Sequence, residues 1–457
     1  MDQENIRVIF SKERELKFIL IGIVLGFLSF FLGGTNVFLV FLLILALIFS
    51  FFRIEIALLS LPFFIIIDFF IKNYTSGFLG LWDEGIFIFL LIVVFYRLYK
   101  EKKFNFKLTT LIYPILAFLM VGLLSIYFSK NVTLPQGIDA IRSVIQPFIF
   151  FLIVINSNIS KKSTRFLLFA GVIAVSIAAL FGIFQFTQGV SVPPNWLDKD
   201  TEVGIGTRAF SFLGSPNAFA GYCILFAPIV LSYFFKDKLK LTHKTIFIFL
   251  FLTIIVGMMS TLTRAAWIAF IPSLILFGIL IKKTKIVIPI VLLIVVMTFS
   301  VAPLRQRFLN LFSEQYQEKS EIGGRTYRWN LAMTIFAENP VLGRGPGSYG
   351  GATAYRYQEF SGLYVDNYYL EILSNYGFLG FLVFTWLILE IVKLFTVSIK
   401  NSTENDKILI IGIFCGFIGF MIHNFTENLW EVIPLSVTLW FLIGLTVNLA
   451  IPGGEND

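Results

Sequence analysis

Charged residues, cysteines and histidines are all scarce in this sequence of 457 residues. Only 14% of the residues are charged, whereas about 25% is usual for a soluble domain. The two cysteines lie within apolar runs and require no disulfide, and two histidines make a histidine-rich metal site improbable. Long apolar runs take their place, because 57% of the chain is hydrophobic and its mean hydropathy is +0.85. Strand-period alternation of barrel length is absent, so we expect an all-α polytopic membrane protein.

About fourteen membrane spans are expected, because each span needs about 20 apolar residues. Twelve to fourteen spans are compatible with the sequence, which is expected to form a single transmembrane domain over 1–457. The charged residues 1–17 lead straight into apolar runs, which is not the pattern of a cleavable signal peptide. The expected spans are 17–34, 36–52, 54–71, 84–99, 109–128, 138–156, 164–187, 217–235, 244–262, 264–281, 285–302, 367–397, 407–424 and 430–450.

Lysine-rich segments mark one side of this topology. By the positive-inside rule that side is the cytoplasm, so the N- and C-termini are both expected to be cytoplasmic. The other side receives one large extracytoplasmic loop, 303–366. The lysine-rich segments are 11–17, 97–107, 161–165, 236–244, 282–285 and 399–407.

Arginine, in contrast, predominates on the expected extracytoplasmic side, which has nine arginines and only four lysines. Topology alone selects for positive charge of either kind, so the change from lysine to arginine needs another cause. Arginine binds phosphate and carboxylate bidentately, whereas lysine acts as a point charge. The excess of arginine on this side therefore predicts a site for an anionic ligand. The formal net charge of +8 is not taken as a sign of nucleic-acid binding. Snorkelling and ordinary ion pairs are the alternative. The nine are Arg142, Arg208, Arg264, Arg305, Arg307, Arg325, Arg328, Arg344 and Arg356.

The large loop contains an amphipathic pattern that predicts a helix from near Arg325 to the residue before Pro340. Its aromatic residues are typical of a helix that lies along the membrane interface. Arg325 and Arg328 would share a face at its N-terminus, where free N–H groups favour anions. A stabilising arrangement of caps and ion pairs accounts equally well for these two arginines.

A glycine-rich segment, "ENPVLGRGPGSYGG" (338–351), follows this helix. It lacks the Lys-Ser/Thr ending of a nucleotide phosphate loop and no soluble strand precedes it, so a nucleotide site is not expected. Glycines such as Gly345 and Gly347 let backbone N–H groups approach an anion or a sugar closely. Arg344 would face the same ligand, with a plain structural turn as its alternative.

Three further stretches place polar residues at extracytoplasmic helix ends. "RAFSFLGSPNAFAGY" (208–222) sets Arg208 before a helix capped by Ser215, with Asn217 at its mouth. "STLTRAAW" (260–267) is a tight turn with Arg264 at its tip. "VDNYYLEILSNYGFLGF" (365–381) opens a span with an Asp-Asn pair, and an acidic residue follows within two turns.

Taken in order, these motifs resemble the O-antigen ligase and Wzy-type polysaccharide polymerase superfamily over roughly residues 205–425. The resemblance implies metal-independent, inverting transfer of glycans from undecaprenyl diphosphate to an acceptor hydroxyl, without a cofactor. It implies that Arg208 and Arg264 hold the donor diphosphate, assisted by Arg344. The ligases carry a histidine directly before asparagine at the start of the helix after the loop. Here Asp366 precedes Asn367, and an aspartate can serve as general base.

The expected function is polymerisation of lipid-linked repeat units at the outer face of the bacterial cytoplasmic membrane. An O-antigen ligase is the alternative within the superfamily, and a lipid-linked sugar flippase or transporter is the alternative from another class. Expected partners are undecaprenyl-diphosphate-linked glycans as donor and acceptor, the bilayer and a chain-length regulator. The expected catalytic residues are Asp366, Arg264 and Arg208, with His423 and Glu371 as alternative bases. The expected substrate-binding residues are Arg344, Arg325, Arg328, Arg142, Asn217, Asn367, Gly345 and Gly347.

Overall fold

The computed structural model describes residues 49–74, 82–100, 106–191, 207–236, 240–300 and 302–450. Regular structure within these ranges is helical. The expected spans 17–34 and 36–52 lie outside the described residues, apart from 49–52. Among the described residues, seven helices are long and apolar enough to cross a membrane. They are α7 (Leu134–Asn156), α8 (Lys161–Thr187), α9 (Pro216–Phe234), α10 (Leu241–Ser260), α17 (Tyr368–Asn401), α18 (Glu404–His423) and α19 (Ile433–Ala450).

Shorter helices complete the bundle. The expected span 54–71 is wrong as a single helix, because it is divided into α3 (Ile54–Leu58) and α4 (Phe64–Tyr74). Pro62 lies in the turn between them and lacks the N–H that a continuous helix needs. The other expected spans agree with helices to within four residues at each end. The shorter members of that set are α5 (Trp82–Lys100), α6 (Ile112–Phe128), α11 (Arg264–Leu280) and α12 (Thr284–Ser300). The total of fourteen spans stays a prediction.

Helix α9 forms the centre of the bundle, because 94% of its apolar 18-residue segment is buried. The corresponding segment of α17 is only 28% buried. Helix α18 packs closely against α9 through its glycines. A Cβ on Gly412 would lie 2.9 Å from the Pro228 carbonyl oxygen, and one on Gly416 would lie closer still to that of Leu225. Small residues at such spacing let helix backbones approach in a membrane.

Helix α17 is broken near its start. Gly377 has a φ of +65°, and its neighbours Phe378 and Leu379 donate their N–H groups to Pro340 and Val341 of the preceding loop. In return, the N–H groups of the loop residues Arg344 and Gly345 donate to carbonyls of α17 (those of Ser374 and Asn375). The glycine loop therefore fills the break and satisfies the backbone groups that a broken helix leaves free.

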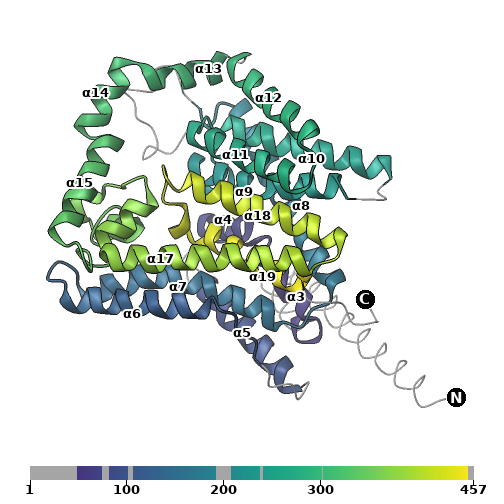
Figure 1. Ribbon diagram of the computed structural model, residues 1–457, viewed down its shortest axis with the longest axis horizontal. Helices are drawn as coiled ribbons and strands as arrows, with labels where there is room; N and C mark the ends of the chain where they lie inside the picture. Colours follow the sequence, from purple (N-terminus) through teal and green to yellow (C-terminus); the bar gives the residue numbers. More distant parts are fainter. Residues whose placement is uncertain are drawn as a thin grey trace, which may run out of the picture.

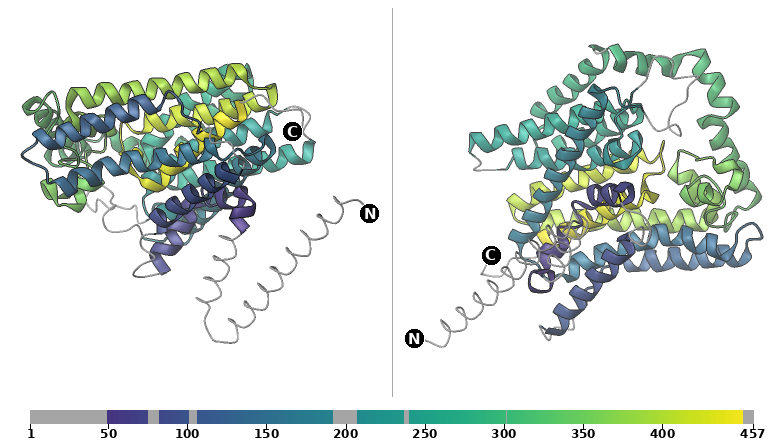
Figure 2. Two further views of the ribbon diagram at one scale, coloured as in Figure 1. Left: turned by 90° about the horizontal axis from the view of Figure 1, so that it is seen from below. Right: turned by 180° about the vertical axis from the view of Figure 1, so that it is seen from behind.

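Between α12 and α17 the chain forms an arch at one end of the bundle (Figures 1 and 2). The arch consists of α13 (Ala302–Leu309), η4 (Asn310–Phe312), α14 (Glu314–Ile322) and α15 (Arg325–Glu338), and α16 (Ala352–Arg356) and η5 (Glu359–Gly362) follow. The predicted helix between Arg325 and Pro340 is confirmed as α15. It packs on α17 and lies across the end of the bundle (Figure 1).

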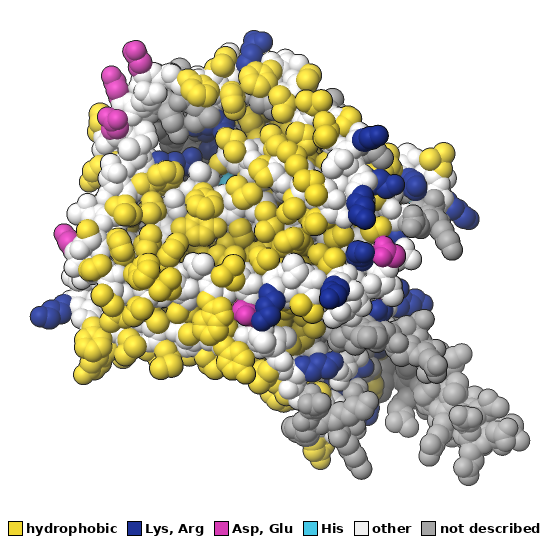
Figure 3. Space-filling model, in the orientation of Figure 1, with side chains coloured by type: hydrophobic (Ala, Val, Ile, Leu, Met, Phe, Trp, Pro, Cys, Tyr) yellow, Lys and Arg dark blue, Asp and Glu magenta, His cyan; other side chains and the backbone are white. Residues whose placement is uncertain are grey.

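Both ends of the bundle carry basic side chains (Figure 3). Successive helices alternate in direction, so that the turns α6–α7 and α10–α11, the arch and the loop between α18 and α19 all lie at one end, called here the arginine end (Figure 1). Lys and Arg side chains also gather at the opposite end, and the flank between is covered with hydrophobic side chains (Figure 3). Which end faces the cytoplasm stays a prediction, based on the lysines.

Candidate functional site

The turn between α10 and α11 lies at the arginine end, and arginine side chains bind its carbonyl groups. Arg208 donates from Nε to the Thr261 carbonyl oxygen at 3.0 Å, and Arg307 donates from Nε to the Leu262 carbonyl oxygen at 3.3 Å. Arg264, the first residue of α11, donates to the Arg307 carbonyl oxygen at 3.1 Å. Three arginines distant in sequence thus meet at one turn.

Asn217 links this turn to the loop between α18 and α19. It lies in the first turn of α9, where Ser215 caps the helix as expected from the sequence. Its Oδ1 accepts from Arg208 Nη2 and from Thr263 Oγ1, both at 3.0 Å. Its Nδ2 donates to Glu427 Oε1 at 2.6 Å. The amide therefore joins a cation on one side to a carboxyl group on the other.

Glu427 and Asp366 bring the start of α15 into the same cluster. Arg325 Nη2 lies 2.7 Å from Glu427 Oε1, and Arg325 Nε lies 3.6 Å from Asp366 Oδ2. Arg328 Nη1 donates to the same oxygen of Asp366 at 2.8 Å and also to the Tyr364 carbonyl oxygen. The site that results is called here the arginine cluster: Arg208, Asn217, Thr263, Arg264, Arg307, Arg325, Arg328, Asp366 and Glu427.

Charge and exposure suit the arginine cluster to an anionic ligand. It contains five arginines and only two acidic residues, an excess of three positive charges when both acids are ionised. The side chains of Arg325, Arg328 and Asp366 are 31%, 25% and 21% exposed, so part of the cluster is accessible. Figure 3 shows basic side chains in the hollow between the arch and the bundle. Guanidinium groups in such a site bind phosphate oxygens through two parallel N–H bonds.

Backbone strain occurs at two places in this site. Leu262 has a φ of +53° and Asp366 a φ of +50°, although neither is glycine. Such conformations cost roughly 1–3 kcal/mol and tend to gather at functional sites. Both residues contact arginines of the cluster, Leu262 through its carbonyl oxygen and Asp366 through its carboxylate.

Burial shifts the acid–base properties of Glu427. Loss of water around this side chain raises its pKa to about 7, although the neighbouring Arg325 acts in the opposite direction. Asp366, a second carboxylate, adds to the rise. Glu427 can therefore exchange a proton near neutral pH, while its contacts hold Asn217 and Arg325 in place.

A second group of acids lies beside the glycine loop. Glu371 of α17 and Glu431 of η6 (Leu429–Glu431) both lie against Gly351 and are 8% and 7% exposed. Glu431 also accepts the Ala352 N–H at 2.8 Å, and Glu371 accepts from the Asn428 amide. Burial and the second carboxyl group raise the pKa of Glu431 well above its usual range.

Five of the residues predicted for substrate or diphosphate contacts lie in the arginine cluster: Arg208, Asn217, Arg264, Arg325 and Arg328. Asp366, the predicted base, lies there too. Arg142 lies elsewhere, in ion pairs with Glu84 and Asp139 at the start of α7. Asn367 caps α17 by accepting the N–H groups of the second and third helical residues at 3.1 Å.

The glycine loop has a packing role. Gly345 has a φ of +121° and its N–H is taken by the Asn375 carbonyl oxygen, while Gly347 has a φ of +76° and lies against Thr353. Arg344 lies over the Phe360 ring, with its Cζ 5.1 Å from the ring centre. Among the described residues, no hydrogen bond or ion pair joins these three to the arginine cluster, and their role in ligand binding stays a prediction.

The alternative bases are both enclosed. His423 at the end of α18 has no exposed surface and makes no side-chain hydrogen bond within the described part of the chain. Glu371 is committed to Asn428. Among the described residues, no hydrogen bond or ion pair joins either of them to the arginine cluster, whose acids are Asp366 and Glu427.

Several site residues were missed by reasoning from the sequence. Glu427, Asn428 and Glu431 belong to "HNFTENLWE" (423–431), which separates the last two spans. Two acids and two amides in so short a segment between two apolar helices are a signal for a site, although their partners are set by the fold alone. Arg307 was counted among the outer arginines but given no role.

A metal site finds no support in the described ranges, where no group of three or more His, Cys, Asp or Glu residues could hold an ion. A search of curated proteins returns no match to the chain. Residues 248–385 match a family model described as O-antigen ligase. The matched segment contains Arg264, Arg307, Arg325, Arg328 and Asp366, whereas Arg208 and Glu427 lie outside it. Over this segment, which is less than half of the chain, the match supports the resemblance to the O-antigen ligase and Wzy-type polymerase superfamily.

Proposed function

We propose that the protein is a membrane glycosyltransferase that polymerises undecaprenyl-diphosphate-linked oligosaccharide repeat units at the outer face of the bacterial cytoplasmic membrane. The observation that carries this proposal is the arginine cluster, in which cations from four separate segments meet two acids at one end of an apolar bundle. The family match on residues 248–385 supports glycan transfer as the reaction class. The polymeric product and the identity of the lipid follow from the resemblance.

The donor diphosphate would bind where the arginines are partly exposed. The side chains of Arg325 and Arg328 are partly exposed, and Arg208 and Arg264 brace the turn between α10 and α11. Arginines stabilise the negative charge that builds on a departing diphosphate, which is usually the largest contribution to such catalysis. The donor carries its own activated bond, so no nucleotide is needed on this side of the membrane.

Asp366 would act as the general base. In the free protein its carboxylate accepts a hydrogen bond from Arg328. An incoming diphosphate competes for Arg325 and Arg328, and Asp366 then becomes free to accept the proton of the acceptor hydroxyl. The acceptor oxygen attacks the sugar C1, the bond from C1 to the phosphate oxygen breaks, and the diphosphate leaves with the bonding electrons. The configuration at C1 inverts.

Ligation of the glycan to a different acceptor is the second candidate. The matched family is described as O-antigen ligase, and the two reactions share the donor and the bond that breaks. The aspartate at position 366, where ligases carry histidine, favours the polymerase. The product distinguishes them, since a polymerase yields a ladder of repeats and a ligase yields a single capped acceptor.

Reconstitution tests the proposal. The purified full chain in liposomes, supplied with the lipid-linked repeat unit of the producing strain, should form longer lipid-linked glycans without added metal or nucleotide. Asp366→Asn should lower this rate by roughly 10²–10⁴-fold if the carboxylate is the base. A wild-type rate in this variant would refute the base assignment. Movement of labelled donor across the bilayer without any new glycosidic bond would instead establish a flippase.

A further inference from the structure

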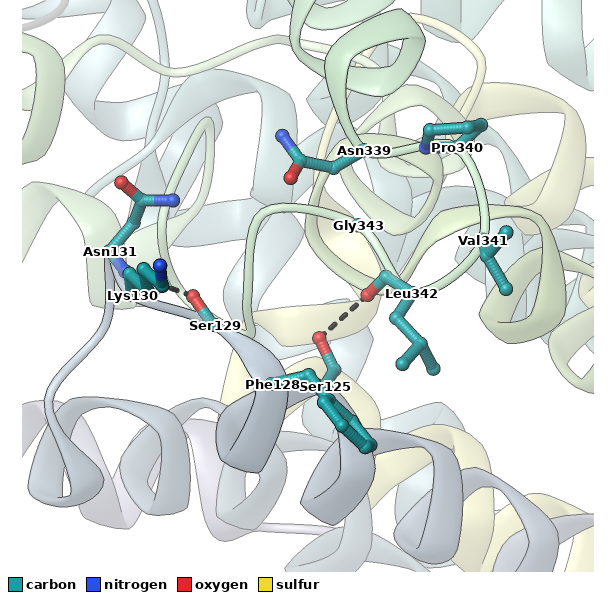
Figure 4. Close-up of a pocket in the computed structure, with 10 residues that line it drawn as sticks. All are labelled: Ser125, Phe128, Ser129, Lys130, Asn131, Asn339, Pro340, Val341, Leu342 and Gly343. Atoms are coloured by element: carbon teal, nitrogen blue, oxygen red, sulfur yellow. Dashed lines mark hydrogen bonds between the residues drawn. The ribbon is translucent and has the colours of Figure 1, made fainter.

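A pocket of about 400 Å³ lies at the arginine end, outside the arginine cluster. One wall is formed by the end of α6 and the turn to α7, and the other by the end of α15 and the beginning of the glycine loop (Figure 4). Its lining residues are Ser125, Phe128, Ser129, Lys130, Asn131, Asn339, Pro340, Val341, Leu342 and Gly343. None of these residues takes part in the mechanism above.

The walls of the pocket are fixed by hydrogen bonds between the two segments. Ser125 Oγ donates to the Leu342 carbonyl oxygen at 2.6 Å, and Ser129 Oγ donates to the Arg344 carbonyl oxygen. The Asn131 N–H donates to Ser129 Oγ at 3.1 Å. These bonds hold the loop against α6, so the pocket is built before any ligand arrives, which lowers the cost of binding.

Three polar side chains at the pocket are available to a ligand. Asn131 and Lys130 lie on one wall, and Asn339 points from the end of α15 toward their side (Figure 4). Among the described residues, neither the Lys130 ammonium group nor the Asn131 amide has a bonding partner. The Asn339 amide makes only a 3.5 Å contact with its own helix. Phe128, which is 65% exposed, adds an apolar ring at the edge.

This combination of groups suits a sugar. Amide groups both donate to and accept from hydroxyl groups, an aromatic ring covers the apolar face of a pyranose, and an ammonium group pairs with an acidic substituent. A lipid tail would need a wall without amides, and a diphosphate would be better served by arginine than by one lysine.

The position of the pocket relates it to the reaction site. Helix α15 has Arg325 and Arg328 in its first turn and reaches the pocket with Asn339, directly after its last residue. With 14 residues and a rise of 1.5 Å each, it separates the two places by roughly 20 Å. Because α15 lies across the end of the bundle, a glycan extending from the arginine cluster along the helix would reach the pocket (Figure 1).

We propose that this pocket is a distal subsite for the glycan chain, in which Asn131 and Asn339 bind sugar hydroxyls and Lys130 binds an acidic substituent of the sugar. The inference rests on the proposed function, because it assumes that a glycan extends from the arginine cluster. Only a glycan long enough to span α15 gains the contact. The subsite therefore makes the protein favour long acceptors over a single repeat unit.

The test uses the reconstituted full chain and acceptors that carry either one repeat unit or several, taken from the producing strain. Lys130→Gln and Asn339→Ala should raise the KM for the long acceptors roughly fivefold or more and leave the KM for the one-repeat acceptor unchanged. Lys162→Gln removes a comparable exposed charge at the start of α8, and Asn330→Ala removes an exposed amide from α15, so both are matched controls. Equal effects on long and short acceptors, or none on either, would overturn the subsite.

A binding measurement separates this inference from the proposed function. Fluorescently labelled saccharide, released from the surface polymer of the same strain, is titrated against the protein in nanodiscs with and without phosphatidylglycerol. The subsite is supported if Lys130→Gln binds the native saccharide more weakly than the wild type does but binds the carboxyl-reduced saccharide equally well. This result would hold even if the wild type forms no glycosidic bond. Failure to form that bond counts only against the proposed function. The subsite is refuted if saccharide affinity is the same in Lys130→Gln, Asn339→Ala and the wild type. It is also refuted if the two substitutions change only the effect of phosphatidylglycerol.

Discussion

Arginine rather than lysine is required where one side chain must meet two partners at fixed angles. Arg208 shows this in the site, because Nε reaches the Thr261 carbonyl oxygen while Nη2 reaches the Asn217 amide. The sequence revealed the preference for arginine on one side of the chain. It did not reveal the partners, because the turn carbonyls and Glu427 come from segments that only the fold brings together.

Replacing Arg208 with lysine should therefore impair turnover despite the retained charge. A lysine has a single nitrogen and cannot bind the turn and Asn217 together, so a loss of roughly 10–100-fold in kcat/KM is expected. Arg305→Lys is the control, since Arg305 is an exposed arginine of α13. The measurement is the initial rate of glycan extension in liposomes. Equal rates in Arg208→Lys and the control would show that the guanidinium geometry is unimportant.

Glu427 predicts a pH dependence of stability. Its pKa is about 7 in the folded protein against 4.5 in the ordinary side chain, so the folded chain holds the proton more tightly. Between these two pH values the folded state binds more protons than the unfolded state, and stability falls as the pH rises through the window. Glu427→Gln keeps an oxygen for Arg325 and Asn217 but cannot ionise. The fall in Tm between about pH 4.5 and about pH 7 should be several degrees smaller in this variant.

The control for that experiment is Glu404→Gln. Glu404 lies in the first turn of α18 at the opposite end, with a side chain that is 81% exposed, so its removal should leave the pH dependence of Tm unaltered. Thermal unfolding of the purified protein across this pH range supplies both values. A Glu427→Gln curve parallel to that of the wild type would contradict the proposed burial of an ionisable group.

Elements were predictable from the sequence where local signals agreed. The cap at Ser215 with Pro216 marks the start of α9, and Pro340 marks the end of α15. The break in α17 was not predictable, because residues 367–397 are mostly apolar and glycines are common in membrane helices. What breaks the helix is the loop that docks on Gly377, a contact between segments more than thirty residues apart.

Gly377→Ala should destabilise the protein by about 1–3 kcal/mol or more. The residue has a φ of +65°, and a Cβ would lie 2.5 Å from the Gly343 nitrogen, so strain and overlap act together. The lowered Tm in detergent measures the effect. Gly85→Ala in α5 is the control, since a Cβ there meets no heavy atom within 4 Å. A Tm for Gly377→Ala equal to that of the control would disprove the tight docking of the loop.

At the scale of the whole molecule, hydropathy alone predicted the helical class. The distribution of lysine and arginine alone predicted one lysine-rich side and one arginine-rich side. Alternating helix directions follow from short connections, which the sequence also indicates. The closeness of α18 to α9 depends on glycines whose partners lie about 190 residues earlier in the chain, so no local pattern could assign it. The same holds for the arginine cluster, to which α9, the α10–α11 turn, the arch and the α18–α19 loop each contribute.

Sidedness is testable with single cysteines, because Cys223 and Cys415 are both buried and should give little background labelling. Asn330→Cys lies exposed on α15 at the arginine end, and Lys162→Cys lies exposed at the start of α8 at the other end. A membrane-impermeant maleimide should label the first variant in intact cells and the second only after permeabilisation. The reverse pattern would invert the topology inferred from the lysines.

The loop that closes the break in α17 also has a consequence for biogenesis. Residues 340–345 are synthesised before α17, so the segment that supplies the missing hydrogen-bond partners already exists when the helix enters the bilayer. A broken helix that waited alone in lipid would carry unsatisfied amide and carbonyl groups at a cost of several kcal/mol each. We therefore expect translocation of the arch and its loop to precede stable insertion of α17. The order in which the segments are synthesised would then set the order in which they assemble.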